Sequence, residues 1–519
     1  MTQKLPRAYL DRMRRLLGEA EFERYLASFS EKRSAAFRCN RLKCRPDELK
    51  DLLAPGIFAD PVSWTDNGFY YGKEELSRHP AYYAGLYYLQ EPSAMTPAAC
   101  LPLHPGDRVL DLCAAPGGKS TELGARLGGT GVLIANDISH SRALALLGNL
   151  ERFGIPNLFV TSEASGKLAD SFPEWFDAIL IDAPCSGEGM FRKDPHMVED
   201  WLEKGPSYYA PIQKQLLSDA ARMLAPGGYL LYSTCTFAPE EDEEQILAFL
   251  SGNPDFSPIR LDPDPAFCHP QVLCEAVKAY PHRLRGEGHF ICLLQKAGGE
   301  AADSAVKEGR KPEKETLPPT FRPFAERFLS LSAASDRGGR FRDRQKAAAC
   351  RDRSAGRSSG KPLSGKASAS QMAQAGLSVD VSAVTDFFAA YGLTLSREAL
   401  YERDGELYLL PDGCLSMPSL RYLRTGLHLG TRKNGRILPS QALAMTLSPE
   451  TWNSCLKLPV GDERILRYLK GETLQLGEED GEVAGDWVLV CMDRFPLGFA
   501  KKEKRLLKNK YQTGWRYRS

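Results

Sequence analysis

Short apolar runs separated by polar, glycine-rich turns dominate the middle of the chain. Five runs have the length of a strand and end at the residues of chemical interest, namely 108–110, 131–136, 158–160, 178–181 and 228–232. Stretches with helical spacing lie between them. Near-continuous apolar strands that alternate with helices are typical of a parallel sheet covered on both faces. The pattern therefore predicts an α/β fold with a Rossmann-like, doubly wound, mostly parallel sheet.

The regions on either side of this unit have different patterns. Residues 5–53 have helical periodicity and are followed by a polar, extended stretch. From 296 to 375 the composition shifts to Gly, Ser, Ala, Lys and Arg, which indicates a linker that is disordered in part. Helical spacing returns at 379–393, and 483–500 is rich in strand-forming residues. We therefore expect a small β domain near the end of the chain.

Length and composition narrow the class of protein. A chain of 519 residues is too long for one core, and 43% hydrophobic with 26% charged residues is ordinary for a globular protein. We find neither a signal peptide at the N-terminus nor the roughly 18 uninterrupted apolar residues that a membrane span needs. The thirteen cysteines are dispersed and odd in number, without metal-ligand spacing. These features predict a cytoplasmic protein with reduced thiols, no membrane contact and no metal.

Positive charge is concentrated although the net charge is only +1. Basic residues are dense in 340–366 and again in 501–510, and Tyr511, Trp515 and Tyr517 follow the second cluster. Clustered cations with aromatic neighbours suit phosphate contacts and base stacking. A solvated basic surface explains the charge equally well.

A candidate cofactor pocket follows the first strand of the sheet. Gly117 and Gly118 open a helix there, which lets the backbone approach a ligand closely. Asp137, at the end of the next strand, can accept hydrogen bonds from ribose hydroxyls. The dinucleotide fingerprint is absent, so a mononucleoside such as S-adenosylmethionine fits better than NAD. Glu163, just after the third strand, could face the adenine, and a tight structural turn is the alternative to the whole site.

Two strand ends carry thiols, in Asp182-Ala-Pro-Cys185 and Ser233-Thr-Cys235. A single cysteine is more often a core residue, but two at the rim of one nucleoside pocket indicate catalysis. Carbon 5 of cytosine is a poor nucleophile until a thiolate adds to carbon 6, and the adduct must later be released with help from a base. Asp182 can polarise the ring, with Lys119 as a cation near the same edge. The spacing leaves open which thiol attacks.

These motifs carry a family resemblance. The stretches 113–119 (Cys-Ala-Ala-Pro-Gly-Gly-Lys), 182–189 and 233–235 resemble the signatures of Sun-type RNA 5-methylcytosine methyltransferases. The segments 88–93 and 281–290, together with Met190-Phe-Arg-Lys193, are similar to the branch of bacterial small-subunit ribosomal RNA methyltransferase F. The resemblance is firm over residues 1–295 and looser in the C-terminal part.

The resemblance implies a class I methyltransferase fold and a role for each motif residue. Cys235 would be the nucleophile and Cys185 would assist release, with Asp182 and Lys119 beside them. The implied S-adenosylmethionine site comprises Cys113, Ala114, Ala115, Pro116, Gly117, Gly118, Lys119, Asp137, Glu163 and Asp182. The implied partner is 16S ribosomal RNA, not DNA, bound by a monomer. Transfer RNA as substrate, or a non-catalytic RNA-binding assembly factor, are the alternatives.

The same resemblance assigns the expected domains. They are an N-terminal α+β RNA-binding domain (1–95), the methyltransferase domain (96–295), a basic linker (296–375), a C-terminal α+β domain (376–440) and a PUA-like β domain for RNA binding (441–519). On this division the C-terminal domains are separable, so a chain ending at Ala375 should have weaker RNA affinity and keep cofactor binding.

Overall fold

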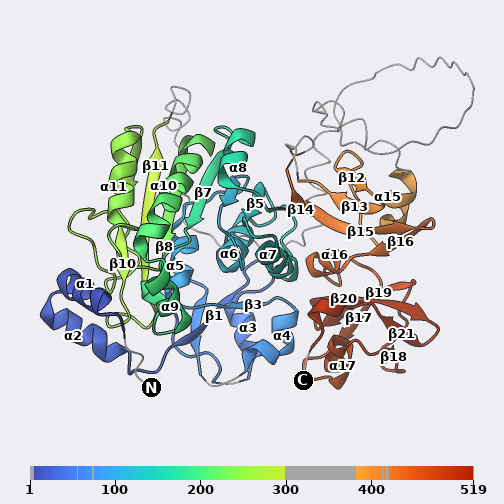
Figure 1. The fold of residues 1–519 in the computed structure, drawn as a ribbon. Helices are drawn as coiled ribbons and strands as arrows, with labels where there is room; N and C mark the ends of the chain where they lie inside the picture. The colour runs from blue at the N-terminus through green and yellow to red at the C-terminus, as the bar shows by residue number, and fades with distance from the viewer. Residues whose placement is uncertain are drawn as a thin grey trace, which may run out of the picture.

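In the view of Figure 1 a central α/β unit lies above an N-terminal domain, and two C-terminal β units lie beside both. The computed structural model describes residues 5–54, 56–72, 75–298, 381–411, 414 and 420–517. Nearly all of the predicted linker, with the basic stretch 340–366, lies outside these described residues.

The central sheet has nine strands. In spatial order they are β10 (Val277–Ala279), β11 (His289–Lys296), β8 (Leu224–Thr234), β7 (Phe176–Asp182), β4 (Arg108–Asp111), β5 (Val132–Asn136), β6 (Leu158–Thr161) and β14 (Tyr422–Thr425), with β9 (Phe256–Ile259) also paired to β11. The five strands from β8 to β6 are parallel, and the others are antiparallel to their neighbours. This arrangement confirms the predicted Rossmann-like, mostly parallel sheet.

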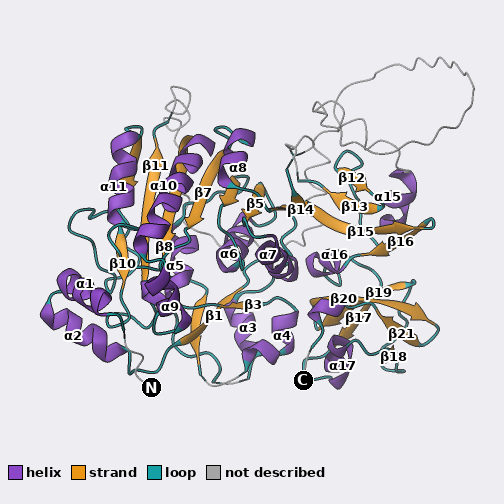
Figure 2. Ribbon diagram, viewed as in Figure 1, coloured by secondary structure: helices purple, strands orange, loops and turns teal. Residues whose placement is uncertain are grey.

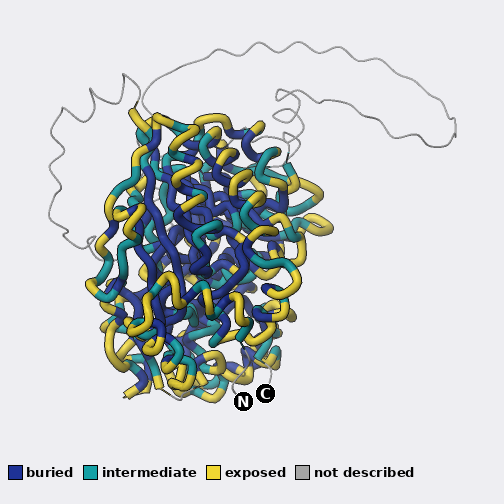
Figure 3. Tube along the Cα trace, turned by 60° about the vertical axis from the view of Figure 1, so that its left-hand side comes forward, coloured by how far each residue is buried: buried dark blue, intermediate teal, exposed yellow. Residues whose placement is uncertain are grey.

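The inner parallel strands are largely apolar because they contribute to two cores. Successive side chains of a strand point to opposite faces of the sheet. Val109 therefore packs in the core shared with α5 (Thr96–Cys100), α6 (Gly118–Leu127) and α7 (His140–Phe153). Leu110 packs in the other core, with α8 (Ser165–Ser171), α10 (Pro206–Met223) and α11 (Glu243–Gly252). Figure 2 shows these helices on the sheet, and Figure 3 shows the buried centre of the molecule.

The N-terminal domain joins two helices to a small sheet. Helices α1 (Arg7–Leu17) and α2 (Glu19–Ser28) precede the strand order β2 (Gly68–Tyr71), β1 (Ala35–Cys39) and β3 (Tyr87–Leu89), and α3 (Pro46–Leu52) and α4 (Pro80–Tyr83) complete it. Helical periodicity over 5–53 thus predicted α1, α2 and α3 correctly and missed β1. Helix α9 (His196–Glu203) packs near α1 through Trp201.

Two smaller sheets form the C-terminal part. The first has the order β12 (Leu400–Arg403), β13 (Glu406–Leu409), β15 (Leu427–Lys433) and β16 (Arg436–Pro439), flanked by α15 (Val381–Ala389) and α16 (Gln441–Thr446). The second has the order β17 (Cys455–Leu458), β19 (Trp487–Met492), β20 (Phe495–Glu503), β21 (Leu506–Asn509) and β18 (Leu474–Gln475), with α17 (Glu463–Lys470) beside it. The predicted helix near 379–393 and strands near 483–500 correspond to α15, β19 and β20.

Two of the three aromatic residues that follow the basic cluster are buried and are therefore not available for base stacking. Tyr511 and Trp515 are 2% and 7% exposed and belong to the core that the five-stranded sheet shares with the N-terminal domain. The guanidinium of Arg152, on α7, lies 5.0 Å from the centre of the Trp515 ring. Tyr517 lies against Tyr83. These side chains therefore attach the end of the chain to the rest of the molecule.

Strand β14 was not predicted as part of the central sheet. It pairs with β6, and the ring centres of Tyr422 and Phe159 are 5.9 Å apart. Leu410 and Cys414 also pack into the core on that face of the sheet. The C-terminal region thus completes the sheet, which changes the expectation that it is separable.

Among the described residues, no helix combines the length and the apolar character that crossing a membrane requires.

Removal of residues 376–519 should therefore destabilise the central unit. Without β14, the backbone of β6 has no partner on that side and the apolar side chain of Phe159 is uncovered. We expect a melting temperature several degrees below that of the full chain and weaker S-adenosylmethionine binding by calorimetry. A chain ending at residue 447, which retains β14, is the control. Equal cofactor affinity in the full chain and in the chain ending at 375 would contradict this.

Candidate functional site

The parallel register of the central sheet brings the predicted motifs to one edge. Asp182 is paired with Ser233 across β7 and β8, and Asp111 is paired with Leu180 across β4 and β7. Residues that follow these strand ends must therefore meet at the carboxyl edge, where open α/β sheets bind ligands.

The two candidate thiols are in direct contact. The sulfur atoms of Cys185 and Cys235 are 3.2 Å apart, and the backbone N–H of Cys235 donates to the Cys185 sulfur at 3.3 Å. Cys185 is 8% exposed, whereas Cys235 is partly exposed. The hydrogen bond with Cys235, together with burial, raises the pKa of the Cys185 thiol. Cys185 is therefore held as a neutral thiol next to a more accessible sulfur.

The loops after the two strands are tied together behind the thiols. The hydroxyls of Ser186 and Thr236, each one residue beyond a cysteine, are 2.9 Å apart. The Glu241 carboxylate accepts from the Ser186 N–H at 3.0 Å and from Gln213 at 2.8 Å. All four residues are fully buried. This network fixes the separation of the sulfur atoms.

Asp182 is held as a carboxylate beside the thiols. Lys119 donates to its Oδ2 at 2.7 Å, and the Ser233 hydroxyl donates to its Oδ1 at 3.0 Å. Burial opposes ionisation, but Lys119 and the neighbouring His289 outweigh it and lower the pKa of Asp182. Asp182 can therefore accept hydrogen bonds from a base, and in the ionised state it has no proton to give.

The glycine-rich loop adopts the close approach that its sequence predicts. Gly117 has a φ of +110°, which favours glycine, and a Cβ on Gly118 would come within 3.0 Å of the Gln90 amide. Arg38, on β1, donates to the Gly118 carbonyl at 2.7 Å and also pairs with Glu122. The N-terminal domain thus holds the first turn of α6, which carries Lys119.

The remaining loop positions pack against the next strand and helix. The Ala114 N–H donates to the Asn136 carbonyl at 2.8 Å, and the Pro116 carbonyl accepts from Asn149 at 2.8 Å. The Ala115 carbonyl accepts from Arg142 at 2.9 Å. Burial raises the pKa of Cys113, which therefore stays a neutral thiol at the start of the loop.

Asp137 follows the end of β5, as predicted for a ribose-binding acid. It is 2% exposed, its Oδ1 accepts from the Ser139 N–H at 2.9 Å, and its Oδ2 is 3.4 Å from Arg142. A backbone cradle at Gly117 with a buried carboxylate one strand away fits a nucleoside cofactor.

Glu163 makes its contacts with the C-terminal region. Its carboxylate accepts from Lys167 at 2.6 Å and from the backbone N–H of Arg421 at 2.7 Å, and the Arg421 guanidinium is 3.3 Å away. The Ser162 N–H donates to the Arg421 carbonyl at 3.2 Å. The acid expected to face the adenine therefore also anchors the segment that leads into β14.

Two site residues were absent from the predicted set. Asp111 ends β4 and accepts from the Ser120 hydroxyl at 2.5 Å, while its Oδ1 is buried without a partner. Burial, with Asp182 nearby, raises the pKa of Asp111 to about 7. His289, at the start of β11, lies 3.8 Å from Asp182. An acid at a strand end before the glycine loop was a usable signal for Asp111, and His289 lies in the segment 281–290 that carries the family resemblance, although no role was predicted for it.

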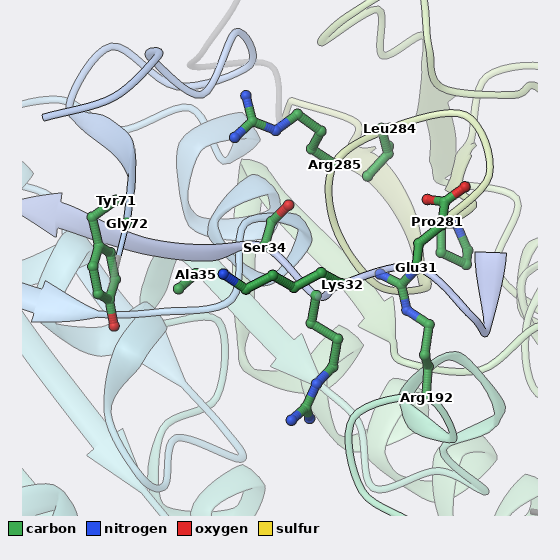
Figure 4. A pocket seen from close by; sticks show the side chains of 11 residues that line it. Glu31, Lys32, Ser34, Ala35, Tyr71, Gly72, Arg192, Pro281, Leu284 and Arg285 are labelled. Atoms are coloured by element: carbon green, nitrogen blue, oxygen red, sulfur yellow. The ribbon is translucent and has the colours of Figure 1, made fainter. Parts of the chain in front are cut away.

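A basic cleft of about 400 Å³ lies between the N-terminal domain and the central unit (Figure 4). It is lined by the basic residues Lys32, Arg33, Arg192 and Arg285, together with Tyr71 and one acid, Glu31. Arg192 forms an ion pair with Glu287 at 3.1 Å. The segment that forms one wall continues to Gly288, whose N–H donates to the Gly189 carbonyl, and the Gly189 N–H in turn donates to the Cys235 carbonyl at 2.9 Å. Two backbone hydrogen bonds thus connect the segment that follows the cleft wall to the loop that carries Cys235.

Within the described ranges, no group of three or more His, Cys, Asp or Glu side chains is arranged to hold a metal ion.

Models of known families match almost all of the described chain. Residues 98–295 match 16S rRNA methyltransferase RsmB/F, and residues 5–92 match the N-terminal domain of 16S rRNA methyltransferase RsmF. Residues 386–447 match the first C-terminal domain of the RsmF rRNA methyltransferase, and residues 455–517 match the methyltransferase RsmF PUA domain.

Individual relatives extend the match over the full length. Ribosomal RNA small subunit methyltransferase F of Escherichia coli (strain K12) is 30% identical over 525 residues, which cover 98% of this chain and 96% of the relative. The protein with the same name from Erwinia tasmaniensis is 35% identical over 305 residues, 56% of this chain and 63% of its own. The crystal structure of PH0851 has a TM-score of 0.52 at 28% identity and covers 56% of this chain and 66% of that one.

Replacement of Asp111 by Asn should change how stability depends on pH. The folded state keeps a proton on Asp111 up to about pH 7, whereas the unfolded chain releases it near the ordinary pKa of 3.8. Wild-type stability therefore falls as pH rises through this window, by at most about 1.4 kcal/mol per pH unit from this group. Asn cannot ionise, so its stability lacks this pH dependence. In urea unfolding from pH 5 to 8, the free energy of unfolding of Asp111→Asn should therefore rise relative to that of the wild type up to about pH 7. A difference that is constant with pH would contradict the assignment.

Proposed function

Because the chain belongs to the 16S rRNA methyltransferase RsmB/F family, we propose that it methylates carbon 5 of a cytosine in 16S rRNA through a covalent adduct with Cys235. The strongest support is the pair of sulfur atoms 3.2 Å apart, next to the Asp182 carboxylate. Enzymes of this family use S-adenosylmethionine, which supplies the methyl group.

The residues of the carboxyl edge fit this cofactor. The backbone from Cys113 to Lys119 would hold its methionine part, because Gly117 and Gly118 leave room for a ligand against the chain. Asp137 would bind the ribose hydroxyls, and Glu163 would lie beside the adenine. Asp182 would lie where the cofactor meets the target base.

The first step is the attack of Cys235. Its sulfur forms a bond to carbon 6 of cytosine, and the electron pair of the carbon 5–carbon 6 double bond becomes available at carbon 5, which takes up the methyl group. The hydrogen bond and burial that raise the pKa of Cys185 keep that thiol protonated. Cys185 can therefore donate to a thiolate on the more exposed Cys235, which supports Cys235 as the nucleophile.

Release of the product uses the second thiol. Once Cys235 is bonded to carbon 6, its contribution to the raised pKa of Cys185 is removed, and the Cys185 proton passes to solvent. The Cys185 thiolate removes the proton from carbon 5, the double bond to carbon 6 re-forms, and the bond between carbon 6 and the Cys235 sulfur breaks with its electron pair returning to sulfur. The cytosine leaves as its 5-methyl derivative.

The alternatives have less support. A non-catalytic assembly factor has no need of two adjacent thiols and a paired aspartate, all of which are present. A transfer RNA substrate has no support from the reported relatives, which are named for the small ribosomal subunit; the one from Escherichia coli (strain K12) is matched over 96% of its own length. We further propose that the protein acts as a monomer in the cytoplasm, which sedimentation and cell fractionation would test.

We also propose that the basic cleft receives the RNA backbone. Lys32 offers a cation at its rim, and the Arg285 guanidinium, which forms an ion pair with Asp60 at 2.5 Å, lies 3.9 Å from the centre of the Tyr70 ring. Phosphates bind such clustered cations without regard to sequence. The link from the cleft wall through Gly288 and Gly189 to Cys235 would put a bound strand beside the thiols.

The thiol roles can be tested by paired substitutions. Cys235→Ala should abolish methyl transfer to 16S rRNA, because no sulfur can add to carbon 6. Cys185→Ala should instead accumulate a protein–RNA adduct that survives denaturing electrophoresis. Cys274→Ser, at an exposed cysteine, is the control and should retain activity. Normal turnover by Cys185→Ala, with the adduct formed by Cys235→Ala, would reverse the assigned roles.

The cleft can be tested by charge reversal. Lys32→Glu with Arg285→Glu should weaken 16S rRNA binding at least tenfold and should lower the slope of log affinity against log salt by about one for each phosphate that is no longer bound. Cofactor affinity should not change. Lys214→Glu, at an exposed site on α10, is the control. The same affinity and salt slope in the double variant and the control would place the RNA elsewhere.

A further inference from the structure

His289 is a buried histidine with one unsatisfied nitrogen at the edge of the active site. The residue begins β11, opposite Ala279 of β10, and is 2% exposed. Its Nδ1 lies 3.3 Å from the Ser93 hydroxyl, which is bonded in turn to Glu91 at 2.5 Å. Its Nε2 has no hydrogen-bond partner and lies 3.8 Å from Oδ1 of Asp182.

Burial of a polar nitrogen without a hydrogen-bond partner costs folding free energy. The Nε2 atom of His289 is unusual because it is directed at a carboxylate and still has no partner. His282, whose side chain is similarly buried, bonds its Nε2 to a carboxylate oxygen of Glu21 at 2.9 Å and leaves Nδ1 unpaired. In His289 the unpaired nitrogen is the one directed at a carboxylate, which already accepts from Lys119 and Ser233. Nε2 is therefore close to Asp182 without being satisfied by it.

The proposed reaction leaves one proton unassigned. When a thiolate adds to carbon 6, electron density moves through the ring to nitrogen 3, and a proton at nitrogen 3 neutralises it. Asp182 is the acid beside the base, but Lys119 keeps it ionised. Some other group must therefore carry that proton.

We propose that His289 is a positioning residue that acts through Asp182, supplying the proton that neutralises nitrogen 3 during the attack of Cys235. The proton leaves Nε2 of the imidazolium for Asp182 Oδ1 and passes to nitrogen 3, and the imidazole becomes neutral. It returns by the same path when the Cys235 sulfur leaves. This inference rests on the proposed cytosine chemistry. The distance of 3.8 Å between Nε2 of His289 and Oδ1 of Asp182 shortens to that of a hydrogen bond when the base binds, as contacts in active sites commonly do.

The surroundings of His289 contain few other titratable groups that could serve. Asp182 faces it from β7, with Lys119 of α6 behind, and Glu91 reaches it only through Ser93. On the paired strand β10, Lys278 is engaged by Asp242 and Glu243. Glu287, two residues earlier in the chain, is bonded to Arg192.

The test is the pH dependence of single-turnover methylation of 16S rRNA at saturating S-adenosylmethionine. His289→Phe should lower the rate at pH 7 by about tenfold or more, since it removes the proton carrier. His289→Gln keeps an N–H of similar reach but cannot give up its proton, so its rate should stay as low as that of His289→Phe at every pH. His282→Gln is the control, at a buried histidine bonded to a carboxylate outside the active site.

A wild-type pH profile in His289→Gln, or a rate for His289→Phe within twofold of the wild type, would overturn the role of His289. A defect in His289→Phe that His289→Gln restores at every pH with the wild-type profile would show a structural role instead. Cys235→Ala is assayed in parallel to distinguish failure of the His289 role from failure of the proposed function. Activity in Cys235→Ala would contradict the proposed function itself.

Discussion

The parallel register of β7 with β8 is the constraint on which the candidate site depends. Hydrogen bonding between the strands places Asp182 opposite Ser233, so the cysteines that follow each strand end must approach each other. The buried network around Glu241 then holds the loops at the spacing seen between the sulfur atoms. A shift of one residue in this register would turn the side chains of Asp182 and Ser233 to opposite faces of the sheet, because side chains alternate along a strand.

Charge at the site is organised around one carboxylate. Asp182 accepts from Lys119 and Ser233 and faces His289, so it stays ionised although it is largely enclosed. Asp111, only one strand away, has the opposite environment and keeps its proton to about pH 7. Two neighbouring acids thus differ in protonation because Asp182 is paired with a cation, whereas Asp111 is buried and bonded only to a hydroxyl.

The C-terminal region contributes directly to the central sheet and to the candidate cofactor site. β14 completes the central sheet, and Arg421 contacts Glu163 at the expected adenine end of the cofactor site. The aromatic residues of the tail are used for packing, as Trp515 against Arg152 shows. Base stacking is therefore not a role of Tyr511 or Trp515, and the basic cleft is the surface that we propose for the RNA backbone.

The sequence by itself determined the central strands, the glycine loop and the two thiol motifs, because each depends on local periodicity or on a short motif. It also predicted that these motifs share one edge, since parallel strands end together. Only the tertiary structure decided which distant segments join them. β14 and His289 reach the site from far along the chain, and the tail aromatics are buried by partners that are remote in the sequence, such as Arg152. Pairing across such separations leaves no periodic signal in a single sequence, so only the packing shows which residues meet.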